Sequence, residues 1–289
     1  GRYVLPGFVN THVHTSQQIS RGVGDDVDFI CWLHDRMWPF ESNMTEEDSY
    51  VSTLMTSLEL IRSGVTSFAE PGGQFVSGMA RGTAESGLRG KLAKSVMDCG
   101  EGLPEIWQRT MEQELEQQVV DLEKFHNTAD GRVQVWFGLR TIFNNTDELC
   151  VRTKELADKY GVGIHMHVAE SRLQAVAAQK LWGKSPIAYL AERGVLGKNF
   201  IAAHAVWLDD SDLDLIARHG ATLSGRGIDF EAELESFLRR AERTAFGPST
   251  LAILEEAISR DIPYIRLNSA SFVQLGQGVH RSEERRVGK

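Results

Sequence analysis

Features that define several large classes of protein are missing from this chain. Its three cysteines, Cys31, Cys99 and Cys150, are widely spaced and form no C-x-x-C pair, which predicts reduced thiols in a cytoplasmic protein. No apolar run approaches the roughly 20 residues of a membrane span, so we expect neither a membrane partner nor a signal peptide. The formal net charge of −9 argues against nucleic acid or an anionic membrane as a partner.

Strand-like and helix-like segments alternate along most of the chain. Each strand with its helix takes about 30 residues, which predicts parallel strands joined by helical crossovers. One helix is predicted over 45–64, where Thr45 and Asp48 form a capping box and Gly64 ends the helix. Six strands are predicted in all, and ATLS at 221–224 is expected to begin a seventh.

The fold class that this pattern favours is α/β, as a (β/α)8 TIM-like barrel. The polar residues that could carry chemistry follow the C-terminal ends of predicted strands, where such barrels place their active sites. An open doubly wound sheet would more often carry a glycine-rich phosphate turn after its first strand, and the sequence has none there.

Two histidines end the first predicted strand, in the sequence NTHVHT at 10–15. Side chains alternate along a strand, so His12 and His14 project from the same face, which is the mouth of a barrel at this point. Neutral imidazoles at this spacing can bind one divalent metal ion together. The pair is a weak signal by itself, and the preceding Pro6 and Gly7 strengthen it.

A second cluster, HMHVAE, ends the fifth predicted strand. His167 would be a third metal ligand, and Glu170 lies where a carboxylate can reach a metal-bound water without binding the metal. His165 points the same way as His167 but one layer deeper, where a hydrogen-bonded interior histidine and a substrate contact are equally open. His204 ends the sixth strand, and beside the other clusters we favour an active-site role for it.

These clusters belong to five longer stretches that resemble the amidohydrolase superfamily. The stretches are LPGFVNTHVHTSQQISRGV, WLHDRMWPFESNMTEEDSY, SGVTSFAE, GIHMHVAES and AAHAVWLDD. Within the superfamily they resemble the branch that deaminates S-adenosylhomocysteine, methylthioadenosine, 5'-deoxyadenosine and related purine nucleosides. Triazine chlorohydrolase-like and guanine deaminase relatives belong to the same branch. The resemblance covers residues 1–224 and implies a metal-dependent hydrolase barrel there.

The resemblance also implies functional residues and a mechanism. One divalent metal ion, zinc or sometimes iron, would be held by His12, His14 and His167, and its bound hydroxide would attack the ring carbon that carries the amine. Glu170 would shuttle the proton, and His204 would hydrogen-bond the metal water or the tetrahedral centre. The implied partner is a small N-heterocycle or nucleoside, and the family is often homo-oligomeric. Deamination and dechlorination share this attack, so a triazine-type chlorohydrolase and a guanine deaminase stay open as alternatives.

Three residues besides His165 are candidates for substrate contacts. Trp32 lies in the loop after the first strand, where it could cover a flat heterocycle or pack the loop onto the barrel. Arg140 ends the fourth strand where many relatives have a purine-contacting histidine, and this departure leaves the heterocycle open. Glu70 ends the second strand and is a candidate for ribose or metal-adjacent contacts, although a solvated loop carboxylate is the favoured interpretation.

The character of the sequence changes after Ser224, where a charged helix over 225–247 is predicted and a second helix and a strand follow. The family's remaining metal ligand, an aspartate that ends an eighth strand, has no match that we find, and we predict a domain boundary near 224–226. Residues 225–280 contain AFGPST, RDIPYIRLN and FVQLGQG, which resemble the region before the ATP-grasp module of cyanophycin synthetase. Residues 281–289 resemble a translated sequencing adapter.

Together these parts predict a chimeric sequence. It would hold an incomplete barrel of strands one to six and the start of a seventh, an unrelated α/β segment, and an artefactual tail. We expect poor solubility and little or no activity, because an open barrel exposes an unpaired edge strand and its apolar interior. Two other classes stay open: an ATP-dependent ligase fragment, favoured only by residues 230–280, and a non-enzymatic chain that keeps the barrel for protein contacts. A cytidine-type zinc deaminase is excluded, because H-x-E with a P-C-x-x-C partner is absent.

Overall fold

The computed structural model describes residues 6–221, 248–260, 262–266, 273–275 and 282–283. The chain divides into two compact units. The first unit contains the described residues of 6–24 and 29–221, and the second contains 25–28 and the described residues from 248 onward. All the candidate site residues belong to the first unit.

Parallel strands form the centre of the first unit. In order, β1 to β4 make one sheet and β5 to β7 make another, and every neighbouring pair is parallel. The bounds are Phe8–Asn10 (β1), Val65–Ala69 (β2), Arg89–Leu92 (β3), Val133–Val135 (β4), Phe137–Leu139 (β5), Ile164–Val168 (β6) and Phe200–His204 (β7). The prediction of an α/β fold with parallel strands is confirmed.

The predicted fourth strand is divided into β4 and β5 at Trp136. The Trp136 N–H donates to the carbonyl of Leu92 at 2.8 Å, whereas the next N–H, that of Phe137, donates to the carbonyl of Gly163 at 2.9 Å. The chain therefore changes its hydrogen-bonding partner here, from the end of β3 to the residue before β6. A parallel bridge from Val96 to β5 joins the two sheets.

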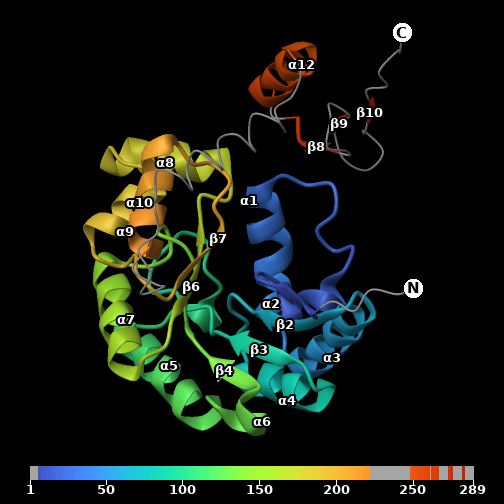
Figure 1. Ribbon diagram of the computed structural model, residues 1–289, viewed down its shortest axis with the longest axis vertical. Helices are drawn as coiled ribbons and strands as arrows, with labels where there is room; N and C mark the ends of the chain where they lie inside the picture. Colours follow the sequence, from blue (N-terminus) through green and yellow to red (C-terminus); the bar gives the residue numbers. More distant parts are fainter. Residues whose placement is uncertain (1–5, 222–247, 261, 267–272, 276–281, 284–289) are drawn as a thin grey trace. The chain divides into compact units, whose positions relative to one another are not determined.

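Helices lie around the outside of the strands, as Figure 1 shows for α3, α4, α5 and α7. The longer helices are α3 (Glu46–Arg62), α4 (Val76–Ser86), α5 (Met111–Phe125), α7 (Asp147–Tyr160), α8 (Arg172–Trp182), α9 (Pro186–Glu192) and α10 (Asp210–Ala221). The shorter helical segments are η1 (Thr15–Ser20), α1 (Phe29–Cys31), the π-helix η2 (Trp32–Met37), α2 (Trp38–Glu41), η3 (Glu105–Trp107) and α6 (Thr128–Gly131).

The predicted ends of α3 are confirmed. The Asp48 N–H donates to Thr45 Oγ1 at 3.2 Å, and the Thr45 N–H donates to Asp48 Oδ2 at 2.8 Å, which completes the capping box. Gly64 follows the helix with a φ of 81°, a left-handed conformation that favours glycine. The prediction that a strand begins at Ala221 is wrong at that residue, because Ala221 is the last residue of α10. Alanine is a strong helix former. Residues 222–224 lie outside the described residues.

The core of the first unit lies between the strands and the helices. Phe68, Leu92, Leu139, Leu149 and Ile164 are among its fully buried side chains. They come from four different strands and from α7, so the core joins the whole unit that carries the candidate site.

We expect Leu149→Ala to lower the free energy of unfolding by about 2 to 5 kcal/mol, because truncating a buried leucine leaves a cavity. Leu181→Ala on α8, where the side chain is 63% exposed, should change it by less than about 0.5 kcal/mol. Chemical denaturation measures both values, and equal losses would contradict the packing of α7 against the sheet.

The described part of the second unit contains α12 (Pro248–Ser259), β8 (Tyr264–Arg266), β9 (Val273–Leu275) and β10 (Ser282–Glu283). The strands pair antiparallel in the order β10-β9-β8. A helix followed by a strand agrees with the pattern predicted here. The charged helix predicted over 225–247 lies outside the described residues.

Two further observations concern the cysteines and membranes. Cys99 and Cys150 form no disulfide, and burial raises the pKa of the Cys150 thiol to about 12, which keeps it protonated. Among the helices that the structure describes, none combines the length and the apolar character needed to cross a membrane.

Candidate active site

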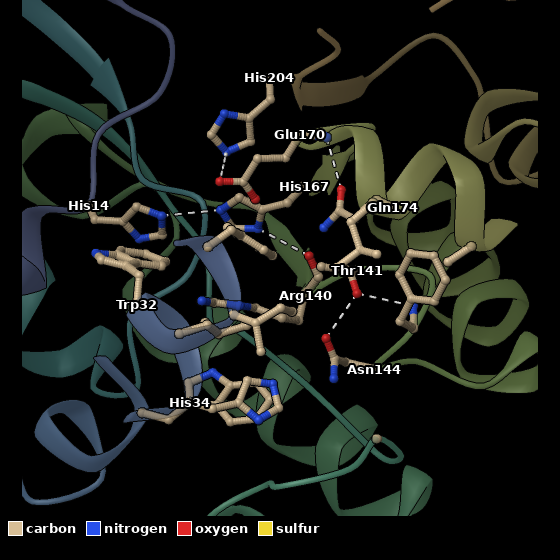
Figure 2. Close-up of a pocket in the computed structure, with 18 of the residues that line it drawn as sticks. His14, Trp32, His34, Arg140, Thr141, Asn144, His167, Glu170, Gln174 and His204 are labelled. Atoms are coloured by element: carbon tan, nitrogen blue, oxygen red, sulfur yellow. Dashed lines mark hydrogen bonds and ion pairs between the residues drawn. The ribbon is translucent and has the colours of Figure 1, made fainter. Parts of the chain in front are cut away.

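A cavity of about 650 Å³ lies where the central strands of the first unit end. Its walls include His12 and His14 after β1, Arg140 after β5, Glu170 after β6 and His204 at the end of β7 (Figure 2). This is the end of the strands at which a (β/α)8 barrel places its chemistry. The structure therefore brings together residues that the sequence separates by up to 192 positions.

His14 and His167 lie next to each other in the wall of this cavity. Their rings stack, with the two Nε2 atoms 3.1 Å apart (Figure 2). The Nδ1 of His167 lies 3.1 Å from the carbonyl oxygen of Arg140, which can only accept, so this Nδ1 carries the proton and Nε2 presents a lone pair. A backbone carbonyl that holds the far nitrogen in this way is a common support for histidine ligands of metals.

His12 and His204 complete a group of four converging imidazoles. The ring centroid of His12 lies 5.2 Å from that of His14, 5.1 Å from that of His167 and 4.7 Å from that of His204. Nitrogens of His12, His167 and His204 all lie within 4.8 Å of one another, a spacing that could hold one metal ion. The predicted ligand set was His12, His14 and His167, and the geometry adds His204 to the possible ligands.

Burial keeps the imidazoles neutral. Desolvation, with smaller contributions from His204 and Arg140, lowers the pKa of His12 to about 4. Desolvation and then the Arg140 guanidinium hold the pKa values of His14 and His167 well below the usual range. Neutral imidazole is the form that binds a metal ion, so this donor set fits a divalent cation such as zinc.

His165 lies behind this group and does not line the cavity. Its Nε2 is 3.3 Å from Nδ1 of His12, and the residue is buried. Burial lowers its pKa to about 3. His165 is thus placed in the interior within hydrogen-bonding distance of His12, and we propose that it orients His12.

The expectation of a solvated loop carboxylate is wrong for Glu70. The residue is fully buried, because the segment after His14 folds over it and supplies hydrogen-bond donors. Glu70 accepts from the backbone N–H of Thr15, from Thr15 Oγ1 at 2.7 Å and from the Gly72 N–H at 3.1 Å. Burial raises its pKa to about 7, and the hydrogen bonds from Thr15 and Gly72 oppose that rise. Glu70 does not line the cavity, and its Oε1 lies 3.6 Å from Nδ1 of His14, which is too long for a hydrogen bond, so we propose that the carboxylate positions that histidine electrostatically.

We expect Thr15→Val to lower the free energy of unfolding by about 1 to 3 kcal/mol, because the buried Glu70 carboxylate loses a hydroxyl donor. Zinc affinity should fall roughly 10-fold as His14 loses its support. Denaturation and zinc titration measure these effects, and Thr66→Val at an exposed position of β2 is the matched control. An unchanged zinc affinity would contradict the positioning role.

Glu170 and His204 meet beside the other imidazoles in the cavity wall. The Glu170 Oε1 lies 3.5 Å from the His204 Nε2 (Figure 2). Burial raises the pKa of Glu170, and Arg140 opposes that rise, whereas burial and then Arg140 lower the pKa of His204. Both shifts favour neutral groups: a raised pKa lets Glu170 hold a proton more readily than an exposed carboxyl, and a lowered pKa keeps the His204 imidazole neutral.

The backbone near these two residues adopts an uncommon conformation. Ala169, His204 and Ala205 have φ values of 51°, 70° and 47°, in the left-handed region that residues other than glycine rarely occupy. The Ala205 N–H donates to the carbonyl of Val168 at 3.0 Å, which ties the end of β7 to the end of β6. The fold thus holds Glu170 and His204 in place at some cost in backbone strain, as active sites often do.

Trp32 and Arg140 both line the cavity. Trp32 lies in η2, where its ring centroid is 6.2 Å from that of Phe29, and it packs against the small core cluster of Leu33, Trp38, Met97 and Trp107. The packing role predicted for Trp32 is therefore observed, and its place in the wall leaves it available to cover a ligand. Arg140 is 5% exposed.

Two supporting residues were not predicted from the sequence. Gln174 lines the cavity, and its Oε1 accepts a hydrogen bond from the Glu170 N–H at 2.9 Å. Thr15 binds Glu70, as described above. An available signal was the S-x-x-Q spacing of Ser171 and Gln174, which is typical of a helix N-terminus, where Ser171 caps α8 and accepts from the Gln174 N–H at 3.3 Å.

The sequence model of the amidohydrolase family matches residues 3–262. The chain belongs to this family. The resemblance drawn from the histidine clusters is confirmed, and the matched range extends past the predicted boundary near 224–226.

Two curated relatives of this amidohydrolase are deaminases. The 5'-deoxyadenosine deaminase of Methanobrevibacter smithii is 34% identical over 224 residues, which are 78% of this chain and 50% of the relative. The 5-methylthioadenosine/S-adenosylhomocysteine deaminase of Thermococcus onnurineus is 35% identical over 225 residues, which are 78% of this chain and 51% of the relative. The chain therefore spans about half the length of these relatives.

Solved amidohydrolase-like structures share the fold. An adenosine deaminase from Xanthomonas campestris with bound zinc has a TM-score of 0.67 at 24% identity, over 74% of this chain and 48% of that chain. An atrazine chlorohydrolase from Arthrobacter aurescens complexed with zinc has a TM-score of 0.66 at 20% identity, over 75% of this chain and 52% of that chain. The α/β fold of TIM-barrel type thus extends over about three quarters of the chain.

Proposed function

We propose that the first unit carries the active site of a hydrolytic deaminase for a purine nucleoside or related N-heterocycle. The substrate class is that of S-adenosylhomocysteine, methylthioadenosine and 5'-deoxyadenosine. The observation that carries the proposal is the convergence of neutral imidazoles on one cavity that Glu170 and His204 also line. The activities in the names of the two curated relatives support this reaction.

His12, His14 and His167 would hold one divalent metal ion, because neutral imidazole nitrogens are ligands that zinc prefers and iron accepts. When bound, the metal ion supplies an acidified water at neutral pH. Zinc in the two solved structures of the same fold supports the choice of zinc. His204 would face the substrate rather than serve as a ligand, because its Nε2 is directed to Glu170.

Hydrolytic deamination replaces the exocyclic amine with oxygen. A C–O bond forms, the C–N bond breaks, and the two protons of water end on the ring nitrogen and on the leaving ammonia. Glu170 would carry these protons, because burial raises its pKa towards the pH at which it must both accept and donate. His204 would hydrogen-bond the oxygen of the tetrahedral centre.

We further propose that residues 225–280 and 281–289 are unrelated to the barrel of residues 1–224. The support is the change of sequence character near 224–226 and the stretches that resemble cyanophycin synthetase and a translated adapter. Sequencing the genomic locus across 224–226 tests this proposal. One uninterrupted gene that encodes both sides would overturn it.

The deaminase proposal is tested with the zinc-loaded chain. We expect slow, zinc-dependent ammonia release from 5'-deoxyadenosine, methylthioadenosine or S-adenosylhomocysteine, because three histidine ligands are assigned but no carboxylate ligand. The same assay with guanine tests the guanine deaminase alternative. Chloride release from atrazine tests the triazine-type chlorohydrolase alternative. Calorimetric binding of the nucleosides is a second readout for slow turnover. The proposal is overturned if the zinc-loaded chain neither releases ammonia nor binds any nucleoside more tightly than the zinc-free chain.

A further inference from the structure

The side chain of Arg140 is a buried cation without a counter-ion in the described part of the chain. The residue is 5% exposed, and it lines the cavity between His167 and His34 in the view of Figure 2. Its hydrogen bonds are those of its backbone: the N–H donates to the carbonyl of Val96 at 3.2 Å, and the carbonyl accepts from the N–H and Nδ1 of His167. The guanidinium itself has no ion pair or hydrogen bond within the described residues.

The carboxylates around Arg140 do not neutralise it. Neither Glu41 nor Glu170 forms an ion pair or a hydrogen bond with the Arg140 guanidinium. Glu41 instead accepts a hydrogen bond from Gln17 at 2.8 Å, and Glu170 lies beside His204. Glu101 also lines the cavity, but at an exposed position where water screens its charge.

The other polar groups of this wall are neutral. Thr141 and Asn144 line the cavity next to Arg140, and the Thr141 hydroxyl donates to Asn144 Oδ1 at 2.9 Å (Figure 2). A divalent cation held among the histidines would add positive charge beside Arg140, whose carbonyl contacts His167. The negative charges of the described cavity wall are the carboxylates of Glu101 and Glu170, and neither pairs with the Arg140 guanidinium.

A guanidinium that lines a cavity without a counter-ion is expected to bind an anion there. A desolvated cation is costly unless an opposite charge pairs with it, and the planar fork of arginine matches two adjacent oxygens of a carboxylate. The Arg140 carbonyl holds His167, so this residue is anchored directly beside the candidate metal site. The pairing group must then lie on the reacting heterocycle or on a short substituent.

We propose that Arg140 selects an amino-substituted N-heterocycle that carries an anionic oxygen group, of which a carboxylate is the simplest. This rests on the proposed deaminase function, and within it favours the related N-heterocycles over the adenine nucleosides. Neutral adenine rings offer ring nitrogens but no anion, and they leave the Arg140 charge unpaired. An anionic heterocycle binds more tightly and is oriented by the two parallel hydrogen bonds of the guanidinium.

A matched pair of ligands tests the proposal: 4-aminopyrimidine-5-carboxylate and its neutral carboxamide. Calorimetric titration of the full chain, with and without zinc, should give at least about a 10-fold preference for the carboxylate. Arg140→Gln should abolish this preference, and Arg140→Lys should keep part of it, because lysine retains the charge but not the fork. Arg21→Gln removes an exposed arginine outside the cavity and should leave the preference unchanged.

Each result supports or overturns the proposal that Arg140 binds the anionic group. The proposal is overturned if the wild-type chain binds the carboxylate and the carboxamide with equal affinity, or if the preference for the carboxylate survives Arg140→Gln. A preference that survives the substitution and requires zinc shows that the carboxylate binds the metal ion instead. Zinc content checks the fold of the variants, because Arg140→Gln keeps the carbonyl that holds His167. If Arg140→Gln does not fold, an undiminished preference in Arg140→Lys overturns the proposal. Failure of the deaminase function shows separately, as absent zinc-dependent ammonia release with an intact anion preference.

Discussion

Glu170→Gln should reduce zinc-dependent ammonia release at least about 100-fold and leave zinc binding unchanged. Glutamine has the shape of the carboxyl group but cannot take up and return a proton. The Glu170 backbone N–H still donates to Gln174, so the loop after β6 keeps its conformation. The loss is therefore expected in turnover and not in the binding of metal or nucleoside.

The measurement is single-turnover ammonia release at equal zinc content. Because the expected rate is low, wild type and variant are followed over hours at high enzyme concentration. Glu116→Gln, at an exposed position of α5, removes the same charge and should match the wild-type rate. If Glu170→Gln releases ammonia at the wild-type rate, Glu170 takes no part in the mechanism. If the variant loses zinc, Glu170 is a metal ligand.

The parts of the site that follow from local geometry could be predicted from the sequence. The alternation of side chains along a strand places His12 and His14 on one face, and the parallel strand repeat brings them to the strand ends that carry His167 and Glu170. The structure places all four in the wall of one cavity. These predictions needed only the period of a strand and the direction of its neighbours.

The parts that depend on contacts between distant segments could not be predicted. Glu70 looks like any loop carboxylate in the sequence, and its burial depends on Thr15, which lies 55 positions earlier and supplies two hydrogen bonds. The position of His204 among the imidazoles likewise depends on the turn at Ala205, where φ is positive without a glycine. The predicted fourth strand is divided at Trp136 because the Trp136 N–H bonds to Leu92 and the next N–H bonds to Gly163. No local sequence pattern predicts this change of partner.

His167→Ala should lower zinc affinity at least about 100-fold, an effect larger than the 10- to 100-fold cost of losing a supporting residue. His167 is fully enclosed, its Nδ1 proton is held by the Arg140 carbonyl, and its Nε2 lone pair faces the Nε2 of His14. Zinc titration against a chelator, and zinc content after dialysis, measure the loss.

Parallel variants separate two possible ligand sets. His12→Ala and His14→Ala should each lose zinc as His167→Ala does, whereas His204→Ala should lower affinity less than about 10-fold and impair turnover instead. His219→Gln, in α10 and outside the cavity wall, is the control and should bind zinc as the wild type does. If His204→Ala loses zinc and His14→Ala keeps it, the ligands are the group of three whose nitrogens lie within 4.8 Å of one another. In that case His14 supports His167, and Glu170 would act without a neighbouring histidine free to bind the substrate.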